Sequence, residues 1–507
     1  MHHPVFLISS VLVFLFVIGT LVAPVPAKVL FDGAKSWSID HFDWLFMGGA
    51  NVFVLFCVAL IFLPVGKIRL GGSDATPEFS VVSWFAMLFA AGMGIGLMFW
   101  SVAEPTAYYT NWYGTPLGVE PRTPGGADAA LSATMFHWGL HPWAIYAVVG
   151  LSLAFFTYNK GLPLTIRSGF YPLIQDRAWG WFGHGIDTVA VLATLFGLAT
   201  SLGFGAQQAA SGLHFLFDIP NTINVQIAII CGVTAVAVIS VVRGLDGGVK
   251  VLSQINMAMA ALLLAFVFVV GPTGTIVGNI VDTGTSYLTT IVPLSNWIGR
   301  EDEKFFHGWT VFYWAWWISW SPFVGMFIAR VSRGRTVRQF IIAVLLVPTL
   351  VTLVWMAVFG GSALYQVEAD MGELADGLED VSLAMFQMLD NLPLASITSF
   401  VAICLVLVFF ITSSDSGSLV IDSITAGGKL DAPVVQRIFW AVVEGVVAAV
   451  LLFGGGADAL GALQAAAICV GLPFTVILLA MCISLYKGLV HELAQTAASK
   501  PERKPVG

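Results

Sequence analysis

The chain has 507 residues, of which 58% are hydrophobic and only 10% are charged, and its mean hydropathy is +0.87. A water-exposed surface needs more charge than this, so the composition indicates an integral membrane protein. The net charge is −8 and there is no basic tract, which argues against a nucleic-acid partner. All five cysteines lie in apolar stretches without CxxC spacing, which argues against a disulfide framework and a thiolate metal site.

Twelve segments are apolar enough to cross a membrane, since a hydrocarbon core of about 30 Å needs about 20 apolar residues per helix. They are 5–24, 45–64, 81–103, 137–158, 186–206, 224–242, 252–271, 310–329, 339–360, 394–413, 434–453 and 463–486. The first segment has no small-residue cleavage motif, so we count it as a span. The predicted fold class is an all-α integral membrane protein with twelve transmembrane helices.

The basic residues predict the orientation, because cytoplasmic loops carry an excess of Lys and Arg. With twelve spans, the side that holds both termini carries 17 of the 22 basic residues and the other side carries five. The loop at 362–393, on that other side, has seven acidic residues and no basic one. We therefore expect a multi-pass protein of the cell (inner) membrane with both termini in the cytoplasm.

The third span contains three closely spaced glycines, Gly92, Gly94 and Gly96. Each glycine in a helix costs about 1 kcal/mol relative to alanine. Gly92 and Gly96 alone would form a packing face for a neighbouring helix. Gly94 lies on the opposite side of the helix, however, so local unwinding explains all three better. An unwound segment at mid-membrane offers helix N-termini to an anion and carbonyl groups to a cation.

Pro322 predicts a corresponding break in the eighth span, because proline removes a backbone donor. Two sets of five spans that each open with a broken helix predict an inverted-repeat transporter, a five-plus-five (LeuT-like) fold preceded by two extra helices. The expected units are the extra helices at 1–80, the repeats at 81–271 and 310–486, an external connection at 272–309 with an amphipathic stretch at Asn296–His307, and a short cytoplasmic tail at 487–507.

Four of the 17 tryptophans lie between Trp314 and Trp320 in the middle of the eighth span. At about 100° per residue, Tyr313, Trp316, Trp317 and Trp320 share one arc, with Trp314 about 60° beyond it. An aromatic face at mid-membrane suits a cation with diffuse charge, such as a quaternary ammonium group. A second aromatic group, Trp138, Trp143 and Tyr146, surrounds Pro142, although core packing explains that group equally well.

These residues give the chain a resemblance to the betaine/carnitine/choline transporter family. The match covers nearly the whole chain, and the tryptophan-rich run through Trp309–Arg335 is its most specific part. The resemblance implies a homotrimer that takes up or exchanges trimethylammonium-type solutes with Na⁺ or H⁺ coupling. It also implies an ammonium cage of Trp138, Trp143, Tyr146 and Trp317, a path lined by Trp314, Trp316 and Trp320, and a carboxylate site at the backbone near Gly92, Gly94 and Gly96.

Adjacent hydroxyls at Thr412 and Ser413 in the tenth span could supply oxygen ligands to a hard cation, although membrane Thr and Ser often bond their own helix instead. The resemblance implies a sodium site formed by these two residues with Ala90, Met93 and Phe409. A second family sodium site is only partly preserved: Thr194 and Phe323 match it, but Leu198 stands where a threonine is expected.

Glu444, in the eleventh span, is a candidate proton carrier, but a hydrogen-bonded structural carboxylate explains it at least as well. His137 and His141 share a helical face without a third ligand, which makes a zinc hydrolase a weak alternative. We therefore predict a transporter without a bound cofactor, not an enzyme, that imports a small zwitterion, most simply glycine betaine, with Na⁺ as the coupling ion. The alternatives are a proton-coupled or exchanging carrier of choline or carnitine, and a membrane-embedded enzyme or sensor.

Overall fold

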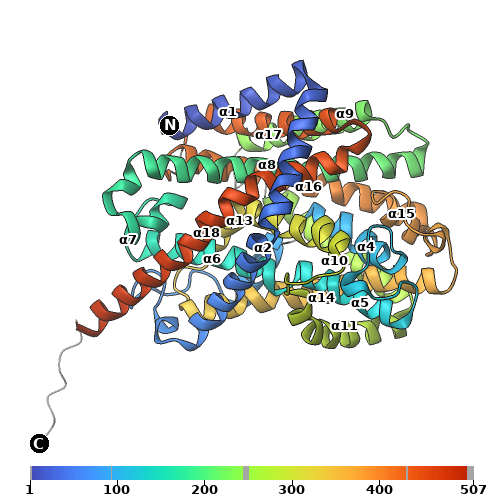
Figure 1. The fold of residues 1–507 in the computed structure, drawn as a ribbon, viewed down its shortest axis with the longest axis horizontal. Helices are drawn as coiled ribbons and strands as arrows, with labels where there is room; N and C mark the ends of the chain where they lie inside the picture. The colour runs from blue at the N-terminus through green and yellow to red at the C-terminus, as the bar shows by residue number, and fades with distance from the viewer. Residues whose placement is uncertain (1–2, 93, 244–249, 430–431, 499–507) are drawn as a thin grey trace, which may run out of the picture.

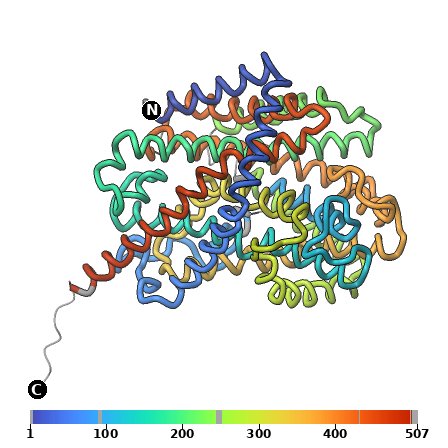
Figure 2. The backbone as a smooth tube through the Cα atoms, in the orientation of Figure 1, coloured from blue at the N-terminus to red at the C-terminus, as the bar shows by residue number. Residues whose placement is uncertain are grey.

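The protein is described by a computed structural model that covers residues 3–92, 94–243, 250–429 and 432–498. The described residues form helices and connecting turns, and their one β pairing is an isolated bridge between Arg69 and Thr336. α1 (His3–Val22) begins, and α18 (Ala459–Ala498) ends, on the left of Figure 1, whereas α15 (Ala384–Asp390) lies on the right. The backbone trace in Figure 2 shows the long helices crossing the molecule in different directions, with α2 (Pro24–Phe62) running from the top of the view toward the bottom.

Each of the twelve predicted spans has a helical counterpart. They are α1, α2 (Pro24–Phe62), α3 (Val81–Gly92) with α4 (Ile95–Thr110), α5 (Pro124–Trp138) with α6 (Leu140–Tyr158), α8 (Trp181–Phe217), α9 (Ile223–Arg243), α10 (Lys250–Val270), α13 (Val311–Val331), α14 (Val337–Glu368), α16 (Ala395–Thr425), α17 (Val434–Gly455) and α18. By length and composition, nine helical segments of the described chain are able to cross a membrane. The all-α membrane fold is thus confirmed, and the count of twelve crossings stays a prediction.

The expected break at Pro322 is wrong, because α13 continues through this residue without interruption. Proline leaves the carbonyl four residues earlier without its helical donor. In α13 that carbonyl belongs to Ile318, and the neighbouring Ser321 hydroxyl donates a hydrogen bond to it at 2.7 Å. The serine therefore replaces the lost donor, and the helix does not need to unwind.

Two other features of the described helices differ from the predictions. A bend at Gly139 separates α5 from α6, and the Leu140 N–H donates to the Tyr287 hydroxyl at 3.0 Å there. The long helix of the connection between α10 and α13 is α11 (Thr273–Leu294), upstream of the stretch at Asn296–His307 for which the sequence predicts an amphipathic segment. That stretch contains only the short α12 (Glu303–Phe305) and the start of a π-turn, η6 (Phe306–Thr310).

α13 lies at the centre of the fold, packed against α6, α8 and α18. Glycines bring α13 and α6 together: a Cβ atom at Gly325 would lie 2.6 Å from Val149 Cγ1 and 3.0 Å from the Gly150 nitrogen. This close contact orients the other side of α13, which carries the aromatic residues, toward α4, α5 and α8. The fold therefore places the tryptophan-rich helix next to the interrupted third span.

Candidate functional site

The third span is interrupted where its glycines predict. α3 ends at Gly92 and α4 begins at Ile95, with Gly94 as its N-cap in an extended conformation (φ −167°, ψ −171°). Met93, which we placed in a sodium site, lies outside the described residues. The N-terminus of α4 consequently opens inside the bundle, where its free N–H groups favour an anionic group.

Aromatic rings approach this break most closely at Gly96. A Cβ atom at Gly96 would lie 2.7 Å from Trp316 Cη2 and 2.8 Å from Trp138 Cη2. At Gly94 the nearest side-chain atom would be Trp320 Cη2, at 3.8 Å. The structure thus joins two features that are more than 200 residues apart in the chain, the broken helix and the aromatic face of α13.

Trp317 is the centre of the aromatic cluster. Its ring centroid lies 4.8 Å from that of Trp138 in an edge-to-face arrangement and 6.1 Å from that of Tyr146. Tyr146 in turn contacts Trp143, with 5.4 Å between the centroids. The four residues predicted to form the ammonium cage are therefore contiguous, and all are buried. Tyr313, which the sequence places on the same aromatic face but not in the ammonium cage, also stacks on Trp317 at 6.1 Å.

Hydrogen bonds to other helices fix three indole rings of α13. Trp317 Nε1 donates to the His137 carbonyl at 2.8 Å, and Trp320 Nε1 donates to the Gly197 carbonyl at 2.9 Å. Trp316 Nε1 donates to the Ser201 hydroxyl at 3.2 Å. A buried indole N–H normally finds such a partner, and the bond also determines which way the ring face points. The aromatic face is therefore preorganised in the described structure.

Trp314 has a different environment from its neighbours. Its ring stacks on His141, with 5.2 Å between centroids, and meets Phe136 edge to face at 5.1 Å. The side chain is fully buried in this packing. The structure therefore packs Trp314 against residues of α5 and α6, and its place on the path stays a prediction.

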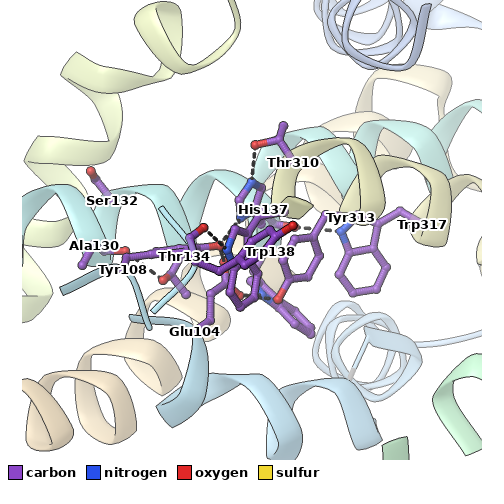
Figure 3. A network of polar contacts seen from close by, with 12 residues as sticks. Glu104, Tyr108, Ala130, Ser132, Thr134, His137, Trp138, Thr310, Tyr313 and Trp317 are labelled. Atoms are coloured by element: carbon purple, nitrogen blue, oxygen red, sulfur yellow. Dashed lines mark hydrogen bonds and ion pairs between the residues drawn. The ribbon is translucent and has the colours of Figure 1, made fainter. Parts of the chain in front are cut away.

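Glu104 is a central residue of this region that the sequence analysis missed (Figure 3). Its Oε2 accepts hydrogen bonds from Trp138 Nε1, at 2.7 Å, and from the Tyr313 hydroxyl. Its Oε1 accepts from the Tyr108 hydroxyl and lies within 2.8 Å of His137 Nδ1. The predicted third span ends at Ala103, whereas α4 continues to Thr110 and the Glu104 side chain is fully buried.

His137 links the Glu104 carboxylate to α13. Its Nε2 lies 2.9 Å from the Thr310 hydroxyl, while its backbone carbonyl holds the Trp317 indole. A neutral imidazole with its proton on Nδ1 satisfies both ring contacts, because it donates to Glu104 and accepts from Thr310. His141 bonds elsewhere, with Nε2 at 3.1 Å from Asn51 Oδ1. Within the described residues there is no group of three potential metal ligands from His, Cys, Asp or Glu.

A cavity of about 630 Å³ lies beside the aromatic cluster, between α3, α10, α13 and α16. Four of the residues predicted for the first sodium site line it: Ala90, Phe409, Thr412 and Ser413. The Thr412 hydroxyl donates to the Val408 carbonyl at 3.0 Å, which is the helix back-bond considered as the alternative. Its lone pairs remain available to a cation. Trp320, whose ring is the side chain nearest to Gly94, lines the same cavity.

The residues predicted for the second sodium site are not brought together by any described contact. Phe323 lines the cavity, whereas Thr194 is buried with its hydroxyl donated to the Ala190 carbonyl at 2.7 Å. Leu198 packs directly against Gly417 of α16. A Cβ atom added at Gly417 would lie only 2.3 Å from Leu198 Cδ1, and it would lie 3.3 Å from Glu444 Oε1. The apolar Leu198 side chain offers no ligand to a cation there.

Glu444 is on α17 and its side chain faces α16, outside the cavity. Its Oε2 accepts a hydrogen bond from the Ser414 hydroxyl at 3.1 Å, and Oε1 has no hydrogen-bond partner among the described atoms. The adjacent Asp415 accepts from the Ser240 hydroxyl of α9. Both carboxyl groups are buried, so they form a second polar cluster distinct from that around Glu104.

Comparison with known proteins identifies the class to which this fold and site belong. Residues 4–494 match the model of the BCCT family, the betaine/carnitine/choline family transporters. The chain belongs to this family, which confirms the resemblance seen in its motifs, and it is a multi-pass membrane transporter and not an enzyme.

Individual relatives are similar over nearly the whole chain. Glycine betaine transporter 1 of Vibrio parahaemolyticus is 65% identical, over 97% of this chain and 94% of the relative. A glycine betaine/proline/choline/ectoine transporter of the same organism is 61% identical, over 97% and 88%. Glycine betaine transporter OpuD of Bacillus subtilis is 43% identical, over 96% and 94%. Among solved structures, a manganese transporter of Eremococcus coleocola aligns with 12% identity and a TM-score of 0.41, over 87% of this chain and 93% of that one.

Proposed function

We propose that this protein is a secondary active transporter that imports a quaternary-ammonium zwitterion, glycine betaine foremost, together with Na⁺. The observation that carries the proposal is the position of the Trp317 cluster beside the helix break at Gly94 and Gly96. Ring faces attract the onium group, and the N-terminus of α4 attracts the carboxylate. A zwitterion such as betaine places these two charges a short distance apart.

The names of the relatives support glycine betaine as the substrate, because each of the three family members described above is named as a transporter of glycine betaine. Gly96 gives further support. Its position has no room for a side chain, and so cannot hold a protein carboxylate that would pair with a carboxylate-free cation such as choline. A substrate that brings its own carboxylate fits this neutral position better.

Sodium coupling is supported by the cavity lined by Ala90, Phe409, Thr412 and Ser413. Paired hydroxyls and carbonyl oxygens suit a small hard cation. A proton-coupled or exchanging carrier of choline or carnitine is the second candidate, and the buried Glu444 carboxylate favours it. We further propose a homotrimer in the cell (inner) membrane with both termini in the cytoplasm, in agreement with the 17 basic residues on that side.

Radiolabelled betaine uptake into proteoliposomes, with Na⁺ and H⁺ gradients imposed separately, tests the proposal. We expect saturable accumulation driven by the Na⁺ gradient alone. Accumulation that follows only the H⁺ gradient would contradict sodium coupling and favour Glu444 as a proton carrier. The absence of saturable betaine uptake under either gradient would contradict the substrate assignment.

A further inference from the structure

The Glu104 carboxylate is a fully buried acidic group with four hydrogen-bond donors around its two oxygen atoms. The donors are Tyr108, His137, Trp138 and Tyr313. The Trp138 indole can only donate, and the carboxylate here serves as an acceptor, as an ionised carboxylate does. These bonds replace the water that the carboxylate lost when it was buried.

Hydrogen bonds do not supply a counter-charge, and the described residues place no Lys or Arg beside Glu104. His137 is the one side chain of ion-pairing type within 4 Å among them, and its contacts are satisfied by the neutral imidazole. A buried carboxylate without a cation is costly even when it is fully hydrogen-bonded. A positively charged ligand beside the rings would therefore supply a counter-charge that the neighbouring side chains do not.

Two of the donors are also rings of the ammonium site. Trp138 and Tyr313 both contact Trp317, with centroids 4.8 and 6.1 Å from it, and both give their polar hydrogen to Glu104 Oε2. The carboxylate consequently lies at the edges of these rings, away from the faces that would meet a ligand. Negative charge at the N–H or O–H edge of a ring makes its face more negative and strengthens its attraction for a cation.

We propose that Glu104 is the positioning residue that makes the aromatic site selective for a full positive charge over a neutral group of the same shape. This inference rests on the proposed betaine function and adds the source of its charge selectivity. Glu104 acts in two ways. Its hydrogen bonds set the orientation of Trp138 and Tyr313, and its charge attracts the onium group across a low-dielectric, water-poor region.

A structural role alone is the alternative, and a pair of ligands separates the two. Glycine betaine and 3,3-dimethylbutyrate have the same shape, but the quaternary nitrogen of betaine is replaced by carbon in the second compound. If Glu104 only stabilises the packing of the helices, Glu104→Gln should weaken both ligands by the same factor. If Glu104 makes the site selective for positive charge, the substitution should weaken betaine by a larger factor than 3,3-dimethylbutyrate.

The experiment measures binding of both ligands to the full-length transporter by tryptophan fluorescence. For Glu104→Gln we expect the ratio of the two affinities to fall by about tenfold, which corresponds to about 1.4 kcal/mol. Glu444→Gln is the matched control, because it removes a buried carboxylate that contacts α16 and not the rings. It should leave the ratio unchanged. If Glu104→Gln changes the affinities for both ligands by the same factor, so that their ratio is unchanged, the inference is overturned.

Tyr313→Phe is a second variant that tests the inference even if Glu104→Gln does not fold. It removes one donor from Oε2 but keeps the ring, the charge and the other three hydrogen bonds. The ratio should fall by a smaller factor, about threefold, and a ratio equal to that of the wild type contradicts the coupling between carboxylate and ring. If the wild-type protein binds neither ligand, the proposed betaine function fails. If the wild-type protein binds both ligands equally well, the charge selectivity inferred for Glu104 fails while the site itself remains.

Discussion

Gly96 lies against the Trp316 ring so closely that a Cβ atom at its position would be 2.7 Å from Cη2. The Trp138 ring reaches the same point from α5, at 2.8 Å. Two rings from different helices therefore rest directly on the backbone of α4. Glycine is required there because of the space that the rings occupy, whereas the Gly94 backbone is extended and accessible to any residue.

Alanine substitutions should therefore separate the two positions. Gly96→Ala forces the rings of Trp138 and Trp316 to move, so we expect betaine affinity to fall by tenfold or more, about 1.4 kcal/mol. Gly94→Ala meets its nearest side-chain atom at 3.8 Å and should retain betaine binding within about threefold. Binding titrations on both purified variants check this difference. Equal effects would show that the ring contacts at Gly96 do not control the site.

Trp317→Ala should abolish saturable betaine transport while the protein remains folded. Each ring face contributes about 0.5–2 kcal/mol to the binding of a cation, and Trp317 is the ring that joins the cage together. Trp317→Phe should bind betaine more tightly than Trp317→Leu, because a phenyl face still attracts a cation and an isobutyl group does not. Unchanged affinity of the alanine variant in a direct binding assay would disprove the cage assignment.

Trp314 provides the contrasting prediction, because its ring packs on His141 and Phe136 away from the cage. Trp314→Ala should lower the stability of the protein by about 3–5 kcal/mol, as expected for loss of a buried aromatic side chain. The folded fraction should bind betaine with nearly wild-type affinity. Thermal unfolding in detergent together with ligand titration tests both parts. A large loss of affinity without loss of stability would return Trp314 to the transport path.

Removal of both hydroxyls at the cavity, Thr412→Val with Ser413→Ala, should weaken sodium binding. Binding linkage is reciprocal, and a coupled effector typically changes affinity by about 5- to 150-fold. In the double variant we expect the sodium-dependent factor in betaine affinity to fall toward one, while affinity measured without sodium stays the same.

Thr398→Val is the control for the sodium experiment, since it removes a back-bonded hydroxyl near the other end of α16. It should keep the sodium dependence of betaine binding. A sodium effect that persists in the double variant at full size refutes the placement of the ion. In that case Glu444→Gln should be compared under an imposed pH gradient.

The sequence by itself determined the positions of the membrane helices, the break near Gly94 and the aromatic face of α13. These features depend on residues within one helix length of each other: hydropathy accumulates over about 20 residues, and a helical face repeats every 3.6. The error at Pro322 was also local in origin, since Ser321 provides the missing donor to Ile318 from the same turn. A serine before a proline in a membrane helix is the signal that could have prevented it.

Only the tertiary structure decided the hydrogen-bond partners of Glu104 and the packing partners of Trp314. Glu104 is bonded to Trp138, 34 residues away, and to Tyr313, 209 residues away, and nothing in the local sequence joins these three. A carboxylate followed by proline resembles the end of a span, and it becomes a buried acceptor only because three packed helices supply its donors. Helical periodicity places Trp314 about 60° outside the arc of the other aromatic residues, but only helix packing decides that its ring stacks on His141. Packing between distant segments places each of these groups, and so hydropathy and periodicity within one span do not contain that information.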